Sequence, residues 1–317
     1  MKGKCFLSLA VRVESMFLPR KILEEKLRQM LAEDIGQGDI TSAVLVLKEC
    51  NAEAEIIAKE SGVAAGIEEA EVLLESLSLK HEALVKDGDE IKPKQVLMKI
   101  YGDARTILAA ERTLLNIISR MSGIATTTRR LVEKVRKAGY KTVVACTRKT
   151  APGLLYFDKK AVSVGGGDTH RLHLDDMILI KDNHTRIAGS IEKAVKTVKE
   201  KVSFSKKVEA EVSSVDEALT AAKAGADIIM FDNFSPNQIK RAIGKLKKAG
   251  FLGKVLLEAS GGITAENIVE YASTGVDIVS LGEITDSPKA LDISLEIKSF
   301  KLPSDSLNYR HLNSRRC

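Results

Sequence analysis

Residues 208–233 read VEAEVSSVDEALTAAKAGADIIMFDN, and this stretch decides the fold class. Two apolar, β-branched runs, at residues 208–212 and 227–231, flank a helical stretch. Short buried strands that alternate with helices are typical of a parallel sheet with helices packed against it. The stretch therefore predicts one β/α unit, with Glu211 near the end of its first strand and Asp232 directly after its second.

Similar apolar runs recur through the C-terminal half of the chain. They occupy residues 142–146, 177–180, 255–257 and 276–281. Repeated β/α units close, fully or in part, into a barrel whose strand ends form one mouth, and active sites are built at that mouth. We therefore expect an α/β fold with a barrel or partial barrel.

Each predicted strand ends in a charged, polar or glycine-rich group. These groups are Arg148-Lys149, Lys181-Asp182, Glu211, Asp232-Asn233, Ser260-Gly261-Gly262 and Gly282-Glu283. If polar residues only marked the points where strands leave the core, one or two such groups would be explained, but not the whole set. We therefore predict a ligand site at the mouth.

The charges at this mouth suit a polyanionic ligand. The cationic residues are Arg148, Lys149, His170, Arg171 and Lys181. Guanidinium groups pair with planar carboxylates or phosphates, so several cations together favour a ligand with several negative charges. Glu211 and Asp232 supply hard oxygen atoms that suit Mg²⁺ or ribose hydroxyls.

Two glycine-containing turns at the same mouth suit phosphate. Ser260-Gly261-Gly262 follows a strand and precedes a helical stretch at residues 265–268, and Gly282 follows the last strand. Exposed backbone N–H groups at such turns bind phosphate. Together with the charges, the turns predict transfer from a phosphorylated sugar to an acidic acceptor, with Mg²⁺ and without an organic cofactor.

Several of these residues also have simpler interpretations. A desolvated Lys181 would suit a Schiff-base aldolase, His170 would suit a loop position with its hydrogen bonds satisfied, and residues 165–167 would suit a flexible turn. Arg112 lies on a helical face with Leu108 and Leu115, where a charge needs a partner. It is either part of an internal salt bridge or presented across an interface to an anion.

The N-terminal third follows a different pattern. Residues 18–33 predict a helix that ends at the acidic, glycine-rich loop 33–41, and residues 52–100 contain short strand-like runs around a helix-like segment at 67–77. This pattern predicts a small α+β domain. Helices at residues 104–121 and 126–138 are expected to follow.

The composition of the 317-residue chain is that of a globular protein, with 44% hydrophobic and 29% charged residues. The net charge of +6 comes with only 4% aromatic residues and no Trp, which disfavours nucleic acid as a partner. The cysteines Cys5, Cys50, Cys146 and Cys317 are far apart, which predicts neither a disulfide framework nor a zinc site and favours the cytoplasm. The apolar run at residues 5–11 is too short to span a membrane.

The motifs resemble those of the quinolinate phosphoribosyltransferase family. The resemblance covers about residues 18 to 300. It is carried by residues 34–41, 111–116, 122–126, 146–153, 164–167, 170–172, 177–184, 231–234 and 258–263.

The resemblance implies an N-terminal α/β sandwich domain and an incomplete α/β (TIM-like) barrel. We expect a disordered extension at residues 1–17, the sandwich at 18–125, the catalytic barrel at 126–300 and a loose basic tail at 301–317. A terminal helix near residues 290–300 is expected to pack back onto the N-terminal domain.

The family's activity joins quinolinate to 5-phosphoribosyl 1-diphosphate with decarboxylation, giving nicotinate mononucleotide, diphosphate and CO₂ in NAD biosynthesis. The resemblance implies such a pentosyltransferase, with Mg²⁺ held by Glu211 and Asp232, directly or through substrate and water. It also implies a homodimer, or a higher assembly, in which Arg112 reaches into the neighbouring subunit's site.

The resemblance also implies roles for the other residues of the mouth. Arg148, Lys149, His170, Arg171 and Lys181 would surround quinolinate and diphosphate, while Ser260, Gly261, Gly262 and Gly282 would hold the 5′-phosphate. Lys149, Lys181, Glu211 and Asp232 are expected to act in catalysis. The chain departs from many relatives at Thr285-Asp286-Ser287, where they have Thr-His-Ser, and a carboxylate there would repel phosphate unless it were turned away or bridged by metal.

Three other functions compete with this interpretation. A related phosphoribosyltransferase of the type associated with molybdate transport would act on another base, a Schiff-base aldolase would use Lys181, and a non-catalytic protein would only bind anions. The set Arg112, Arg148 and Arg171 favours a dicarboxylate acceptor.

Overall fold

The structure is a computed structural model that describes residues 18–302. The described chain forms two compact units. The N-terminal unit contains residues 18–126 and 289–302, and the barrel unit contains residues 127–288. Among the described residues, no helix is both long and apolar enough to cross a membrane.

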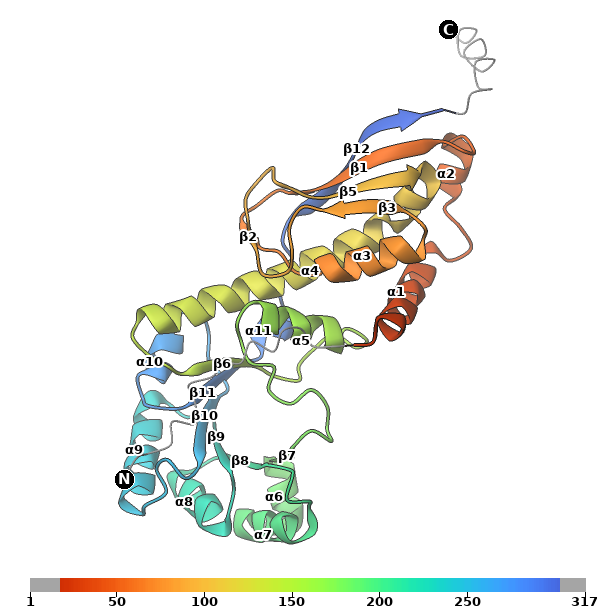
Figure 1. The fold of residues 1–317 in the computed structure, drawn as a ribbon. Coiled ribbons are helices and arrows are strands. Elements are labelled where there is room, and N and C mark those ends of the chain that lie inside the picture. Colours follow the sequence, from red (N-terminus) through yellow and green to blue (C-terminus); the bar gives the residue numbers. More distant parts are fainter. Residues whose placement is uncertain (1–17, 303–317) are drawn as a thin grey trace. The chain divides into compact units, whose positions relative to one another are not determined.

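The N-terminal unit is built on a four-stranded antiparallel sheet. Its strands, in spatial order, are β12 (Ile293–Lys301), β1 (Asn51–Ala58), β5 (Val96–Asp103) and β3 (Lys80–Ala83). Strands β2 (Gly62–Val63) and β4 (Glu90–Ile91) form a separate antiparallel pair. The helices of this unit are α1 (Arg20–Ile35), α2 (Ile40–Leu45), α3 (Ile67–Ser76) and the first part of α4 (Ala104–Lys137). Helices α3 and α4 lie along one face of the sheet (Figure 1).

The segment near residues 290–300 is a strand, so the prediction of a terminal helix there was wrong. Ile293, Leu295 and Ile297 alternate with polar residues, which is the period of a strand. The backbone of β12 pairs with β1 from Ile293 opposite Ala58 to Lys301 opposite Asn51. Residues 1–17 and 303–317, for which an extension and a tail were predicted, lie outside the described residues.

Residues 104–137 form one helix, α4, instead of the two predicted helices. Gly123 lies within it and does not end it. A Cβ atom at position 123 would lie 2.0 Å from the carbonyl oxygen of Lys289. The glycine is therefore required by the close approach of the segment that leads into β12, which the local sequence does not reveal.

The barrel unit contains a sheet of six parallel strands. The strands are β6 (Val143–Cys146), β7 (Ile178–Ile180), β8 (Val208–Val212), β9 (Ile228–Asp232), β10 (Leu256–Ser260) and β11 (Ile278–Leu281). Their spatial order is β6-β11-β10-β9-β8-β7, so β6 and β7 are neighbours in sequence but lie at opposite edges. A closed barrel would require them to pair, and the predicted incomplete barrel is therefore confirmed.

Helices connect the strands and cover the outside of the sheet (Figure 1). They are α5 (Leu155–Val164), α6 (Asp182–Ala188), α7 (Ile191–Lys201), α8 (Val215–Ala224), α9 (Pro236–Lys248), α10 (Ile268–Ala272) and α11 (Glu283–Asp286). Ser214 and Ser235 accept hydrogen bonds from amides in the first turns of α8 and α9, which fixes where these helices begin.

Two aspartates fix how the parallel strands align. Asp227 precedes β9, and its Oδ2 accepts from the amide of Val208 in β8 at 2.7 Å. Asp277 precedes β11, and its Oδ2 accepts from the amide of Leu257 in β10 at 2.8 Å. Because each carboxylate ties the start of its own strand to the neighbouring strand, the opposite ends of the strands meet at one edge of the sheet.

We predict that Gly123→Ala destabilises the protein and that Gly244→Ala stabilises it. The first change forces a methyl group against a backbone oxygen and should cost about 1–3 kcal/mol. Gly244 is exposed within α9, with nothing within 4 Å of an added Cβ, so alanine should stabilise by about 0.5–1 kcal/mol. Thermal unfolding compares the change in melting temperature of the two variants. Equal changes would contradict the close approach at Lys289.

Candidate active site

A cavity of about 620 Å³ opens at the carboxyl ends of the strands in the barrel unit. The structure brings almost all of the predicted site residues to it. Those that line it are Arg148, Lys149, His170, Arg171, Lys181, Glu211, Asp232, Ser260, Gly261, Gly262 and Gly282. They come from separate strand ends, and the parallel order of the sheet collects them at one place.

Arg112 is the one predicted site residue that does not line this cavity. It belongs to the part of α4 in the N-terminal unit, and its side chain is exposed. No ion pair of Arg112 is formed within residues 18–302. The internal salt bridge considered from the sequence is therefore absent from the described chain.

Two cations in the cavity lie close enough to repel each other. Arg148 follows β6, and Arg171 is buried in the loop before β7. Burial and then the like charge of Arg148 lower the pKa of Arg171, while Glu209 and Asp176 oppose this shift. Two guanidinium groups held this way favour an anion that bridges them.

Two carboxylates occupy neighbouring strand ends in the same cavity. Glu211 lies on β8 and Asp232 on the adjacent β9. Burial raises the pKa of Glu211, the negative charge of Asp232 raises it further, and Lys181 opposes both. A pair of carboxylates with a nearby ammonium group fits a Mg²⁺ ion or sugar hydroxyls, because carboxylate oxygens coordinate Mg²⁺ and accept hydrogen bonds from hydroxyl groups.

The turn after β10 is tight and left-handed. Gly261 and Gly262 have φ angles of +86° and +64°. The Oγ of Ser280 donates to the Oγ of Ser260 at 2.9 Å, and the side chain of Asn267 donates to the carbonyl oxygen of Gly262 at 3.0 Å. Helix α10 begins only at Ile268, so this turn rather than a helix end forms the candidate phosphate site.

Asp286 is not turned away from the cavity. It lines the cavity together with Gly282 and Lys149. A Cβ at Gly282 would lie 3.1 Å from Oδ2 of Asp286 and 3.6 Å from Nζ of Lys149. Both charged groups lie close to Gly282 without forming an ion pair among the described residues, and the positive charge of Lys149 offsets part of the repulsion of Asp286 for an anion.

Lys181 is exposed at the start of α6. A Schiff-base lysine requires a desolvated position, which lowers the pKa of its ammonium group. The position of Lys181 therefore favours charge binding over the aldolase alternative.

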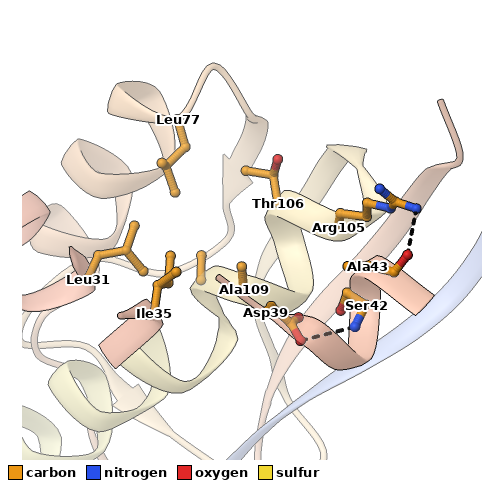
Figure 2. Close-up of a pocket in the computed structure, with 10 residues that line it drawn as sticks. Leu31, Ile35, Asp39, Ser42, Ala43, Leu77, Arg105, Thr106 and Ala109 are labelled. Atoms are coloured by element: carbon orange, nitrogen blue, oxygen red, sulfur yellow. Dashed lines mark hydrogen bonds between the residues drawn. The ribbon is translucent and has the colours of Figure 1, made fainter. Parts of the chain in front are cut away.

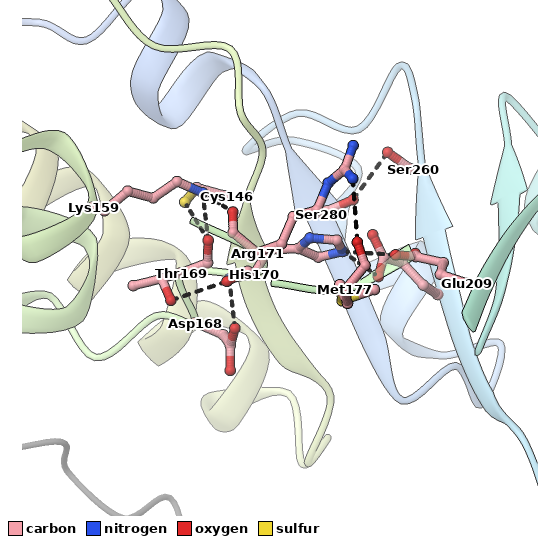
Figure 3. Close-up of polar contacts among 11 residues, drawn as sticks. Cys146, Lys159, Asp168, Thr169, His170, Arg171, Met177, Glu209, Ser260 and Ser280 are labelled. Carbon is pink, nitrogen blue, oxygen red and sulfur yellow. Dashed lines mark hydrogen bonds and ion pairs between the residues drawn. The ribbon is translucent and has the colours of Figure 1, made fainter. Parts of the chain in front are cut away.

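Two glutamates and one lysine around His170 were not predicted from the sequence. Glu258 lines the cavity, and Glu209 and Lys159 are shown in Figure 3. Glu209 and Glu258 are fully buried, and the Nε2 atom of His170 lies 3.4 Å and 3.2 Å from their carboxylate oxygens. Lys159 is also fully buried and donates to the carbonyl oxygens of Thr169 and Arg171. The two carboxylates thus hold the ring of His170, and Lys159 holds the backbone on either side of this residue.

A signal for the two glutamates was present in the sequence. Glu209 precedes Glu211 by two residues on β8, and Glu258 precedes Ser260 by two residues on β10. Residues two apart on a strand point to the same face. A charge on the site face of an otherwise apolar run indicates a buried side chain that pairs with a site residue. Here that site residue is His170.

A second cavity, of about 280 Å³, lies in the N-terminal unit (Figure 2). Most of its lining is apolar, from Leu31, Ile35, Leu77 and Ala109. The polar groups in its wall serve the backbone: Asp39 caps α2 by accepting from the amide of Ser42 at 3.0 Å. Arg105 likewise donates to the carbonyl oxygens of Ala43 and Val46. The acidic loop before α2 therefore acts as a helix cap.

Comparisons with known proteins point to one family. The family model described as quinolinate phosphoribosyl transferase, C-terminal domain, matches residues 124–296. The model described as quinolinate phosphoribosyl transferase, N-terminal domain, matches residues 39–122. The two matches together span both units of the structure.

Similar proteins cover most of the chain. The "Probable nicotinate-nucleotide pyrophosphorylase [carboxylating]" of Methanothermobacter thermautotrophicus is 46% identical over 275 residues, which are 87% of this chain and 99% of that protein. The nicotinate-nucleotide pyrophosphorylase [carboxylating] of Rattus norvegicus is 37% identical over 280 residues, or 88% of this chain and 92% of that protein. The solved structure of nicotinate-nucleotide pyrophosphorylase from Francisella tularensis has a TM-score of 0.81 at 40% identity, covering 89% of this chain and 98% of that chain.

We predict that Gly261→Ala weakens the binding of inorganic phosphate at the turn after β10. A Cβ at this position would lie 2.3 Å from Oδ1 of Asn233. This contact and the left-handed backbone should strain the turn of the variant by about 1–3 kcal/mol. The affinity for phosphate should then fall roughly ten-fold. Gly262→Ala is the matched control, because it shares the left-handed φ but has nothing within 4 Å. Calorimetric titration of both variants compares them, and equal losses would contradict a role for the contact with Asn233.

Proposed function

The chain belongs to the quinolinate phosphoribosyltransferase family, and we propose that its cavity transfers the phosphoribosyl group of 5-phosphoribosyl 1-diphosphate to quinolinate, with loss of CO₂. The products are nicotinate mononucleotide, diphosphate and CO₂, in the biosynthesis of NAD. The observation that carries this proposal is one cavity that combines two adjacent guanidinium groups, a carboxylate pair and a left-handed glycine turn.

The guanidinium groups suit the acceptor. Quinolinate carries two neighbouring carboxylates on a planar ring, and planar carboxylates pair bidentately with arginine. Arg148 and Arg171 repel each other in the free protein, so a dicarboxylate between them relieves that repulsion. The Nε2 of His170 lies against buried carboxylates, and its ring adds a third group to the same side of the cavity.

The rest of the cavity suits the phosphorylated sugar. Ser260, Gly261, Gly262 and Gly282 would hold the 5′-phosphate, and Lys149 and Lys181 would hold the diphosphate. Glu211 and Asp232 would bind ribose hydroxyls and hold Mg²⁺, directly or through water and substrate. When bound, Mg²⁺ supplies positive charge to the diphosphate.

The proposed reaction needs positioning and charge stabilisation rather than a protein nucleophile. The bond between C1 of ribose and the diphosphate oxygen breaks, and its electron pair leaves with diphosphate, whose charge Lys149 and Lys181 stabilise. Positive charge develops at C1, and the lone pair of the pyridine nitrogen forms the new bond there. The cationic ring then accepts the electron pair released when the adjacent carboxylate leaves as CO₂, and a proton takes its place.

Purified protein, quinolinate, 5-phosphoribosyl 1-diphosphate and Mg²⁺ test the proposal. We expect nicotinate mononucleotide and CO₂ to appear in equal amounts, measured by chromatography and by release of labelled CO₂. Nicotinic acid is the control acceptor, because it lacks the second carboxylate and should react far more slowly. Equal turnover of both acids would refute the choice of acceptor.

We further propose that the active protein is a homodimer, or a higher assembly, in the cytoplasm. Arg112 is exposed and forms no ion pair within residues 18–302, which supports its presentation to an anion in another subunit. Cys50 and Cys146 are free and buried, which suits a reducing compartment.

Mixing two inactive variants tests the shared site. Arg112→Ala and Lys181→Ala should each abolish turnover, while co-expression should restore roughly a quarter of wild-type activity, since half of the dimers are mixed and each has one intact site. Arg136→Ala, an exposed arginine in the last turn of the same helix, is the control and should remain active. Failure of co-expression to restore turnover would exclude a site shared through Arg112.

A further inference from the structure

The ring of His170 lies against two buried carboxylates from different strands. Its Nε2 is 3.2 Å from Oε2 of Glu258 on β10 and 3.4 Å from Oε2 of Glu209 on β8. The contact with Glu258 is a hydrogen bond, whereas Glu209 makes a close charge contact. Both glutamate side chains are fully buried, and 11% of the His170 side chain is exposed.

The contact with Glu258 decides which ring nitrogen is available to a ligand. A carboxylate only accepts, so Nε2 carries the hydrogen and donates. The other ring nitrogen, Nδ1, has no hydrogen bond within residues 18–302, and His170 lines the cavity. A neutral ring would present a bare acceptor at Nδ1, whereas an imidazolium ring would present a donor, which is the form that a carboxylate binds.

The backbone of His170 is fixed as firmly as its ring (Figure 3). Its φ angle is +52°, which is uncommon for a residue with a side chain. The amide of His170 donates to Oδ1 of Asp168 at 2.6 Å. The buried ammonium of Lys159 holds the carbonyl oxygens of Thr169 and Arg171, on either side of His170. The ring therefore cannot turn away without breaking several contacts.

We propose that Glu258 is a positioning residue: by accepting the Nε2 hydrogen of His170, it holds the ring as a cation whose Nδ1–H binds a carboxylate of quinolinate. This inference rests on the proposed function for its ligand, while the orientation and charge of the ring are properties of the free protein. Glu209 supports the same charge from the second strand, and Lys159 holds the backbone.

The electrostatics of the cluster support this arrangement. Burial by itself would lower the pKa of His170, but the hydrogen bond with Glu258 and the negative charges of both glutamates outweigh it and raise the pKa to about 10. The carboxylates face the ring from β8 and β10, and Lys159 of α5 faces the adjacent carbonyls. Burial raises the pKa of Glu209 to about 7, so the hydrogen bond with Glu258 is the contact that favours the charged form of His170 across the neutral range.

His170, Glu209 and Glu258 also form a set of side chains that could hold a metal ion. Metal ligation would require Nε2 without its hydrogen and a distance to metal of about 2.0–2.1 Å. The 3.2 Å between Nε2 and Oε2 is the distance of a direct hydrogen bond, but two atoms that each bind one metal ion at about 2.1 Å also lie about 3 Å apart. Metal analysis of the purified protein therefore decides between a shared hydrogen and a bound ion, and we expect no bound metal.

Glu258→Gln tests the positioning role, because glutamine keeps the volume and removes the charge. We expect the KM for quinolinate to rise about ten-fold or more, with the KM for 5-phosphoribosyl 1-diphosphate changed less than two-fold. Binding of benzene-1,2-dicarboxylate, measured by calorimetry, should weaken by the same factor. Glu69→Gln, which changes another fully buried glutamate in the N-terminal unit, is the control and should leave both KM values unchanged.

Nitrogen-15 NMR of the histidine rings keeps the inference falsifiable if Glu258→Gln does not fold. His170 is one of five histidines, and its signals are those lost in His170→Gln. At pH 7.5 we expect both ring nitrogens of His170 to carry hydrogen in the wild-type protein.

Three results would overturn the proposal. They are a neutral ring at this pH, a parallel rise of both KM values in Glu258→Gln, and a bound metal that this change removes. Absence of product with wild-type protein would refute the proposed function while leaving the NMR result intact.

Discussion

The site depends on the parallel pairing of six strands in the barrel unit. Asp227 and Asp277 tie the beginnings of β9 and β11 to their neighbours, so the opposite ends of the strands meet at one edge. Residues as distant in the chain as Arg148 and Asp286 line one cavity for this reason. The open edge between β6 and β7 leaves room for the loop that carries His170 and Arg171.

The cavity holds like charges together before any ligand binds. Arg148 lies near Arg171, and Glu211 lies near Asp232. Such repulsion costs stability in the free protein, and a ligand of opposite charge removes it. The folded chain thus holds both pairs of like charges in place before a ligand arrives, as the proposed function requires.

Asp286 stands at a position where the family resemblance implies a histidine. Its carboxylate lies within reach of Lys149, since both approach Gly282 closely. This part of the cavity therefore has less net positive charge than it would with a histidine at this position. In the proposed function, Lys149 and the left-handed turn after β10, where the backbone itself provides the donors, would hold the sugar phosphates against this charge.

The sequence by itself determined the strands of the barrel and the residues at their ends, whereas the incomplete barrel was expected from the family resemblance. The reason is that apolar periodicity and the groups that follow each run are local properties. Tertiary structure alone decided that residues 293–301 pair with β1 and that α4 continues through Gly123, because both depend on contacts with distant segments. It also decided the partners of His170. Glu258 lies 88 positions away in the chain, and only the order of the strands in the sheet brings its carboxylate to the ring.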